Sequence, residues 1–148
     1  MSATTNAVPN EAQFDAISAR VWHDIARLRT DVFVVEQECA YPEFDGRDVE
    51  PTTRHVWFEA DGCCIAYLRV LDDGDERRIG RVVTVRAHRG RGHAARLLEH
   101  VLASTQGPWV LAAQTYLRDW YGTFGFDAQG DSFVEYGIPH VVMRWGIA

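Results

Sequence analysis

Residues 89–94, Arg-Gly-Arg-Gly-His-Ala, combine fixed positive charge with a backbone that carries little side-chain bulk. They lie between a β-branched run at 82–85 and a leucine-rich stretch at 97–102, where a strand is expected to lead into a helix. The first N–H groups of a helix have no partner within the helix and bind anions. The segment therefore predicts a phosphate-binding corner, and the alternative is an ordinary strand–helix turn with solvated arginines.

The charge distribution favours a compact polyanion as the ligand of this corner. The formal net charge of −6 argues against nucleic acid as the main partner. Residues 77–96 nevertheless contain seven arginines and no acidic residue, a concentration suited to a phosphate group. Lysine does not occur in the sequence, which excludes a Walker-type phosphate loop, a Schiff base and a lysine general base.

Two motifs resemble those of a known family. Arg89-x-x-Gly92-x-Ala94 resembles the R/Q-x-x-G-x-G/A signature of the GNAT acyl-CoA N-acyltransferases, in which the loop holds the pyrophosphate of coenzyme A. Tyr121-Gly-Thr-Phe-Gly-Phe is similar to the family's Y-x-x-x-G-F pattern. Within the family the chain resembles the ElaA-like branch over roughly residues 27–145, through Phe33-Val-Val-Glu-Gln, Gly80-Arg-Val, Arg89-Gly, Ala113-Gln and Gly137-Ile-Pro-His.

The resemblance implies acetyl-CoA as co-substrate, entering where the strands at 77–85 and 109–113 separate. Its pantetheine arm would lie against the backbone of residues 82–84 like an added strand, and residues 90–95 would hold the pyrophosphate. Arg86, Arg89 and Arg96 remain open alternatives for the 3′-phosphate. The residues implied in cofactor binding are Val82, Val83, Thr84, Arg89, Gly90, Arg91, Gly92, His93, Ala94, Ala95, Gln114 and Tyr121.

The implied reaction is transfer of an acetyl group to a primary amine of a small molecule or peptide, by direct attack in a ternary complex. Tyr121 matches the position of the family's proton donor to the departing thiolate. Its alternative role is core packing, since Trp120 and Phe124 share its helix. A backbone N–H of the strand at 77–85 is expected to polarise the carbonyl.

The general base is less clear from the sequence. Many relatives use a glutamate on the strands at 77–85 or 109–113, and these strands contain no acidic residue here. His140 is the favoured candidate because histidine is the side chain that titrates near neutral pH, with His55 and Glu36 as alternatives. Six acidic residues of the loop at 36–50 are expected either to attract a cationic amine or to be solvated: Glu36, Glu38, Glu43, Asp45, Asp48 and Glu50.

The elements that must position these residues follow from periodicity and turn signals. Ser18 is a plausible N-cap for a helix that extends to about Val35. A long irregular loop is expected at 36–53. Strands are expected at 55–60, 63–71, 77–85, 109–113, 132–135 and 140–145, and helices from about 92 to 105 and over 116–124. The fold class is α/β of mixed α+β type: a GNAT-like, mostly antiparallel sheet of six to seven strands flanked by about four helices.

Residues 1–148 are expected to form a single GNAT-like domain, with 1–12 as a loose tail. No signal peptide or membrane span is visible, so we expect a cytoplasmic protein with neither a membrane nor a nucleic-acid partner. Cys39, Cys63 and Cys64 have no metal-ligand spacing, so no metal is expected and packing is their favoured role. A homodimer remains open. Alternative functions are a non-catalytic CoA-binding module and an acyl-homoserine-lactone-type signal synthase.

Overall fold

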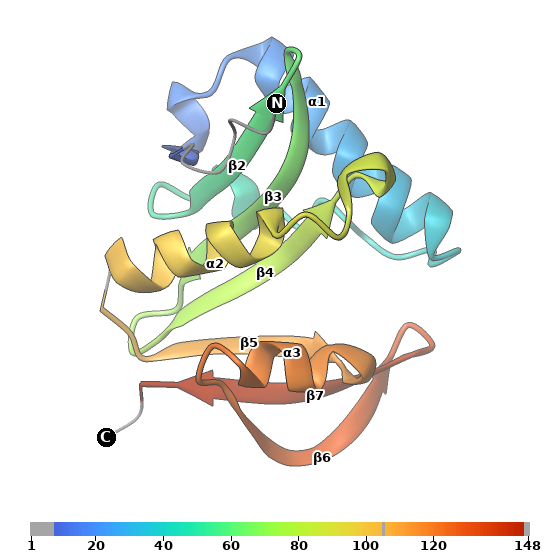
Figure 1. Ribbon diagram of the computed structural model, residues 1–148, viewed down its shortest axis with the longest axis vertical. Coiled ribbons are helices and arrows are strands. Elements are labelled where there is room, and N and C mark those ends of the chain that lie inside the picture. The colour runs from blue at the N-terminus through green and yellow to red at the C-terminus, as the bar shows by residue number, and fades with distance from the viewer. Residues whose placement is uncertain (1–7, 105, 147–148) are drawn as a thin grey trace.

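A computed structural model describes residues 8–104 and 106–146, and a seven-stranded sheet forms its centre (Figure 1). The strand order is β1-β2-β3-β4-β5-β7-β6, and β4 with β5 is the parallel pair in an otherwise antiparallel sheet. The expected α/β fold is confirmed, with three α-helices in the described ranges. The elements are β1 (Asn10–Ala12), α1 (Ala19–Arg29), β2 (Arg54–Ala60), β3 (Cys63–Asp72), β4 (Arg77–Thr84), α2 (His93–Ser104), β5 (Trp109–Gln114), α3 (Arg118–Gly122), β6 (Asp127–Glu135) and β7 (Ile138–Trp145).

The two halves of the sheet meet at β4 and β5 and then separate. These strands pair only at Arg77 with Trp109 and at Arg78 with Val110. Beyond this point β4 and β5 diverge along their length (Figure 1). Past these two residue pairs, the edge of β4 that faces β5 has no neighbouring strand. A ligand can therefore pair with the backbone N–H and C=O groups of that part of β4.

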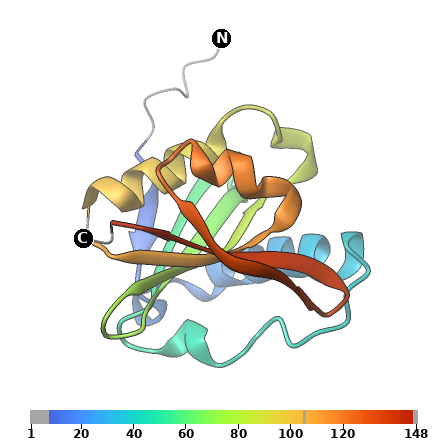
Figure 2. The ribbon, with the colours of Figure 1, turned by 90° about the horizontal axis from the view of Figure 1, so that it is seen from below.

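Helices cover both faces of the sheet (Figure 2). On the face covered by α2 and α3, Leu97 and Leu98 are completely buried in a core that includes Trp109. On the opposite face, Ile25 of α1 is completely buried in a second core that includes Tyr67 of β3. Each such side chain contributes about 1.5–3 kcal/mol through burial, so both layers hold the sheet from which the cleft is built.

The first helix begins where the sequence predicts and changes form before its end. The Ser18 hydroxyl accepts a hydrogen bond from the Val21 amide at 3.2 Å, which confirms it as the N-cap. After Arg29 the backbone widens into a π-helical segment, Thr30–Glu36, instead of continuing as an α-helix to Val35. Such segments are rare and frequently occur at functional sites, and this one leads directly into the long loop.

Three further expectations differ from the structure. Residues 1–7 of the proposed tail lie outside the described residues, but Asn10–Ala12 are not loose, because they pair with β2 as an edge strand. The helix expected over 116–124 is a 3₁₀ turn, Thr115–Leu117, followed by the short α3. The strand expected at 132–135 is the nine-residue β6. None of the described helices has the length and apolar character needed to cross a membrane.

Candidate active site

A cavity of about 550 Å³ occupies the space where β4 and β5 diverge. Both halves of the sheet and the segment after α1 contribute to its wall. The sequence-predicted residues that line it are Val82, Val83, Thr84, Arg89, Gln114, Tyr121 and His140, whereas Gly90, Arg91, Gly92, His93, Ala94 and Ala95 do not. The structure therefore brings Tyr121 and His140 into one cavity, and of the phosphate corner only Arg89 belongs to its wall.

A β-bulge interrupts β4 where it forms the cavity wall. Tyr67 of β3 pairs with Val83 and Arg69 pairs with Gly80, so Leu68 alone faces both Arg81 and Val82. Arg81 has a φ of 54°, an uncommon conformation for a residue other than glycine. A bulge leaves its extra residue out of the ladder, which provides backbone groups at the cavity wall for a ligand.

The phosphate corner has the backbone that its sequence predicts. After β4, a 3₁₀ turn over Arg86–His88 leads into α2, and both Gly90 and Gly92 have positive φ, at 78° and 79°. A Cβ at Gly92 would meet the Arg96 guanidinium at 3.5 Å, an ordinary contact. The first N–H groups of the twelve-residue α2 follow at once, and such groups carry the partial positive charge of a helix start.

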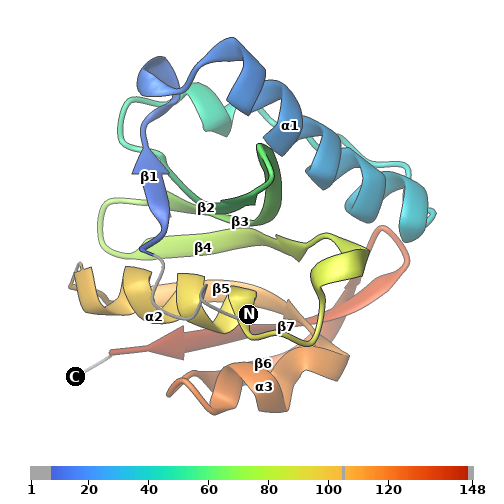
Figure 3. The ribbon, with the colours of Figure 1, turned by 45° about the horizontal axis from the view of Figure 1, so that its top comes forward.

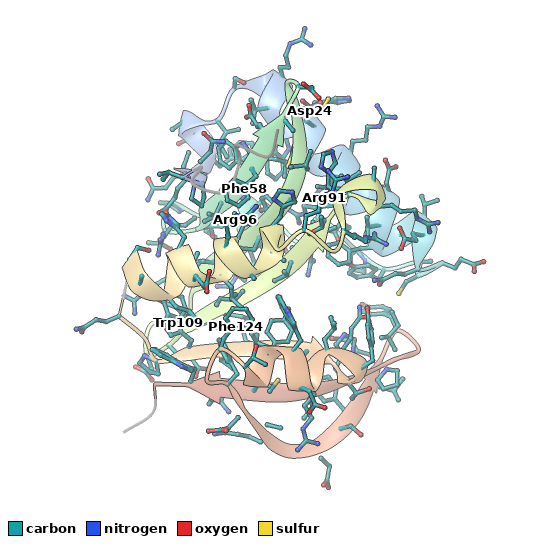
Figure 4. All side chains as sticks on the ribbon, viewed as in Figure 1. Asp24, Phe58, Arg91, Arg96, Trp109 and Phe124 are labelled. Atoms are coloured by element: carbon teal, nitrogen blue, oxygen red, sulfur yellow. The ribbon has the colours of Figure 1, made fainter. Side chains whose placement is uncertain are left out.

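Two side chains of α2's first turn pair with each other beside this corner. His93 is largely buried, with its Nδ1 accepting a hydrogen bond from Arg96 at 2.8 Å. Burial, with the nearby Arg96 charge, lowers the pKa of His93. The Arg96 guanidinium lies over the Phe58 ring at 5.5 Å (Figure 4). His93 would therefore offer its backbone to an anion, whereas the partly buried Arg96 lies beside the corner and donates to the Arg91 carbonyl at 3.3 Å.

Arg89 is held by an acidic neighbour. Its guanidinium donates to both carboxylate oxygens of Glu36, at 2.8 and 3.0 Å, and its Nε donates to the Thr84 carbonyl at 3.0 Å. Arg86 lies 3.7 Å from the same carboxylate but has 77% of its side chain exposed. The hydrogen bond from Arg89 lowers the pKa of Glu36, which makes Glu36 a weaker base than an isolated glutamate.

Tyr121 lies in the cavity wall at the end of α3. The residue is 6% exposed and packs edge-on against Phe126 and Trp120. Burial raises the pKa of its hydroxyl well above the ordinary value. The hydroxyl therefore keeps its proton throughout the neutral range, as a proton donor requires.

His140 faces Gln114 across the β5–β7 pair, and both line the cavity. The Nδ1 atom of His140 lies 2.7 Å from the Ile138 carbonyl. A carbonyl only accepts hydrogen bonds, so Nδ1 carries the proton and Nε2 of the neutral ring has a free lone pair. The ring stacks on Phe133, with centroids 5.8 Å apart. Nε2 is thus the ring nitrogen of His140 that can accept a proton.

His55 is excluded as the base by its position. The side chain is completely buried and does not line the cavity. Its Nε2 donates to the Asp48 carbonyl at 2.9 Å, and its Nδ1 accepts from the Tyr67 hydroxyl at 2.6 Å. Burial lowers the pKa of His55. The ring is a neutral structural link between β2 and the long loop.

Sequence reasoning missed a closed ring of alternating charges, of which Asp45, Arg69 and Arg81 line the cavity and the other three members do not. We call it the arginine–carboxylate ring; its members are Arg29, Glu43, Asp45, Asp48, Arg69 and Arg81. Arg29 lies 2.6 Å from Glu43 and 2.8 Å from Asp48. Arg69 lies 3.1 Å from Asp48 and 2.6 Å from Asp45. Arg81 completes the ring, 3.0 Å from Glu43 and 3.6 Å from Asp45.

The ring changes the interpretation of the acidic loop. Glu43, Asp45 and Asp48 are each matched by arginines within the ring, and Glu50 pairs with Arg47. These four carboxylates therefore stabilise the loop rather than attract a cationic amine. One signal in the sequence indicated the ring: Arg69 interrupts the apolar run of β3, and a buried charge requires a partner.

The cysteines carry no visible chemistry. Cys39 and Cys64 are buried, as expected for packing, whereas Cys63 is exposed. Burial raises the pKa of the Cys64 thiol to about 12, so it stays protonated at neutral pH. A thiol nucleophile acts as the thiolate, which argues against Cys64 as an acyl carrier.

Comparison with known proteins agrees with this geometry. The family model described as an acetyltransferase (GNAT) domain matches residues 15–147. A UPF0039 protein of Mycobacterium tuberculosis is 46% identical over 133 residues, which cover 86% of this chain and 85% of that protein.

Two solved structures have the same architecture over nearly their whole length. An acyl-CoA N-acyltransferase from Pseudomonas aeruginosa is 35% identical with a TM-score of 0.87, covering 94% of this chain and 99% of that one. The crystal structure of Escherichia coli ElaA is 30% identical with a TM-score of 0.88, over the same shares of the two chains.

Proposed function

This chain belongs to the GNAT acyltransferase family, and on that premise we propose that it moves an acetyl group from acetyl-CoA to a primary amine of a small molecule or peptide. One observation carries the proposal. The parallel pair β4–β5 opens after two residue pairs into a cavity lined by Tyr121, Gln114 and His140. An acyl donor and an amine can meet there in a single complex.

The residues present fit coenzyme A. The open edge of β4 offers main-chain groups to an extended pantetheine arm, as in other cases of strand addition. The amides of residues 90–95, at the start of α2, suit a diphosphate, and no acidic side chain lies in that segment. Arg86 is the most exposed of the three arginines considered for the 3′-phosphate, and we assign it that role.

The proposed reaction balances within the cavity. The amine nitrogen forms a bond to the thioester carbonyl carbon, and the carbon–sulfur bond breaks. His140 Nε2 accepts a proton from the amine, and Tyr121 donates its hydroxyl proton to the departing sulfur. A main-chain N–H at the β4 bulge, near Arg81 and Val82, stabilises the negative charge that develops on the carbonyl oxygen.

The test is release of free thiol from acetyl-CoA in the presence of a panel of amines. We expect Tyr121→Phe and His140→Gln each to lower turnover by about a hundredfold or more, while calorimetry shows unchanged affinity for CoA. His23→Gln, a change on the exposed face of α1, is the matched control and should retain full turnover.

Two outcomes would contradict the proposal. Tight CoA binding with no thiol release for any amine would favour a non-catalytic CoA-binding module. Turnover that requires an acyl carrier protein would favour the signal synthase.

A further inference from the structure

The β6–β7 hairpin supplies a wall of the cavity, of which the proposed chemistry uses His140 alone. In this hairpin Glu135 pairs with Ile138, and Phe133 pairs with His140. Alternate residues of a strand share a face, and Glu135, Ile138 and His140 all line the cavity. The tip of the hairpin lies near the segment that follows α1 (Figure 3), and the Tyr41 and Tyr136 rings lie 5.4 Å apart there. Glu135 therefore lies on the His140 face, nearer the cavity mouth.

Glu135 differs from the other acidic groups in the cavity wall. Three carboxylates line the cavity: Glu36, Asp45 and Glu135. Glu36 is paired with Arg89 at 2.8 Å and Asp45 with Arg69 at 2.6 Å. Across residues 8–104 and 106–146, no ion pair or hydrogen bond involves the Glu135 side chain. Its negative charge is thus available to a ligand, whereas those of Glu36 and Asp45 are already matched.

The surroundings of Glu135 suit an organic cation. Tyr136, the next residue, is 56% exposed and presents an aromatic ring at the cavity mouth. Aromatic faces attract ammonium groups, and Ile138 opposite Glu135 offers an apolar surface to a hydrocarbon chain. From His140 outward the wall therefore presents a base and then, one beside the other, an apolar side chain and an unmatched carboxylate.

We propose that the acceptor is an α,ω-diamine or a similarly shaped basic side chain, whose non-reacting ammonium group binds Glu135. This inference rests on the proposed function, with His140 beside the reacting nitrogen. Ile138 and His140 are two residues apart, which is about 7 Å along a strand. A chain of about four or five methylene groups spans that distance. Glu135 is then the residue that determines acceptor specificity, and it takes no part in bond formation.

The experiment compares 1,5-diaminopentane with pentylamine as acceptors for acetyl-CoA, using the full chain. We expect kcat/KM to favour the diamine by about fivefold, the upper end for a partly exposed ion pair. With kcat/KM expressed per amino group, since the diamine has two, the ratio should fall to about one in Glu135→Gln. Asp131→Asn removes the same charge from the same strand outside the cavity wall, and it should keep the wild-type ratio.

A binding measurement separates this inference from the proposed function. Calorimetry of 1,5-diaminopentane with the CoA-loaded protein should give about fivefold weaker binding in Glu135→Gln than in Asp131→Asn. If no amine is acetylated but this difference in binding remains, the proposed function fails and the Glu135 site stands. Equal binding by the two variants, or an unchanged kcat/KM ratio in Glu135→Gln, would overturn the inference.

Discussion

Asp48 is a buried carboxylate that stays ionised behind the cavity wall. Burial opposes its ionisation, but the hydrogen bonds and charges of Arg29 and Arg69 outweigh burial and hold its pKa below the ordinary value. The same balance lowers the pKa of Asp45, where burial is outweighed by the combined effect of the hydrogen bonds from Arg69 and the Arg47 amide and the charges of Arg69 and Arg81. Both groups therefore favour the folded state in their charged form.

The sign of the pH effect follows from these lowered pKa values. An unfolded aspartate titrates near pH 3.9, so in acid the unfolded chain binds protons that folded Asp48 does not. Its stabilising contribution is complete above that pKa and is lost as the pH falls through the lower, folded pKa. In urea unfolding, we expect the stability difference between wild type and Asp48→Asn to be largest at neutral pH and to narrow below about pH 4. A difference that stays constant or widens in acid would contradict the account.

Residue types in the sequence identified the candidate catalytic residues but not the groups with which candidate side chains form hydrogen bonds and ion pairs. Tyr121 and His140 were expected from the sequence, and both line the cavity. The pairing of Arg89 with Glu36 joins positions 53 residues apart, and no local pattern encodes such a contact. The hydrogen bonds of His55 could not be predicted from the sequence either, because its two ring nitrogens bond to groups from separate parts of the fold.

The arginine–carboxylate ring joins four segments of the chain: α1, the loop that follows it, β3 and β4. Arg29 ends α1, Arg69 lies in β3, Arg81 lies in β4, and the three carboxylates come from the loop between α1 and β2. The Arg81 backbone has a φ of 54° at the bulge, a strain of about 1–3 kcal/mol that surrounding contacts must hold. The ring supplies those contacts, so it fixes the bulge that the proposed reaction uses.

Removing one carboxylate from the ring should destabilise the protein strongly. Glu43 is 4% exposed, and its Oε2 accepts from Arg29 and from Arg81. Glu43→Gln leaves the buried Arg29 and the partly buried Arg81 without a full partner, so we expect a loss of about 3 kcal/mol in the free energy of unfolding, measured with urea.

The matched control is Asp31→Asn. It breaks an exposed pair with Arg27 on α1 and should cost at most about 0.5 kcal/mol. Similar losses in Glu43→Gln and Asp31→Asn would show that the ring does not hold the loop.

Helices and strands with strong periodicity were predictable, whereas the features that shape the cleft were not. The 3.6-residue pattern of α2 and the strand-like apolar runs of β2 and β3 indicated their type directly. The π-helical segment at Thr30–Glu36, the bulge at Arg81 and the edge strand β1 depend on contacts with distant parts of the chain. Tertiary contacts determine these three features, and the local propensities of the residues do not predict them.

On the scale of the whole molecule, the function proposed here depends on a sheet that divides. Each half of the sheet is stabilised by its own antiparallel strand pairs. The two halves are joined by the parallel strands β4 and β5, which pair at two positions. The alternation of strands and helices predicted the sheet and its two covered faces. The divergence of β4 from β5 was expected only through resemblance to a family, since no residue in either strand signals it.

The central claim is that the corner at residues 89–94 holds the diphosphate of coenzyme A. Calorimetric titration of CoA into Gly92→Ala and Gly92→Glu tests it most directly, because both variants share the strain of a side chain at φ 79° and differ in charge. We predict that CoA binds Gly92→Glu at least about thirtyfold more weakly than Gly92→Ala, since a carboxylate would face the phosphates. Equal affinities for CoA in the two variants would contradict the claim.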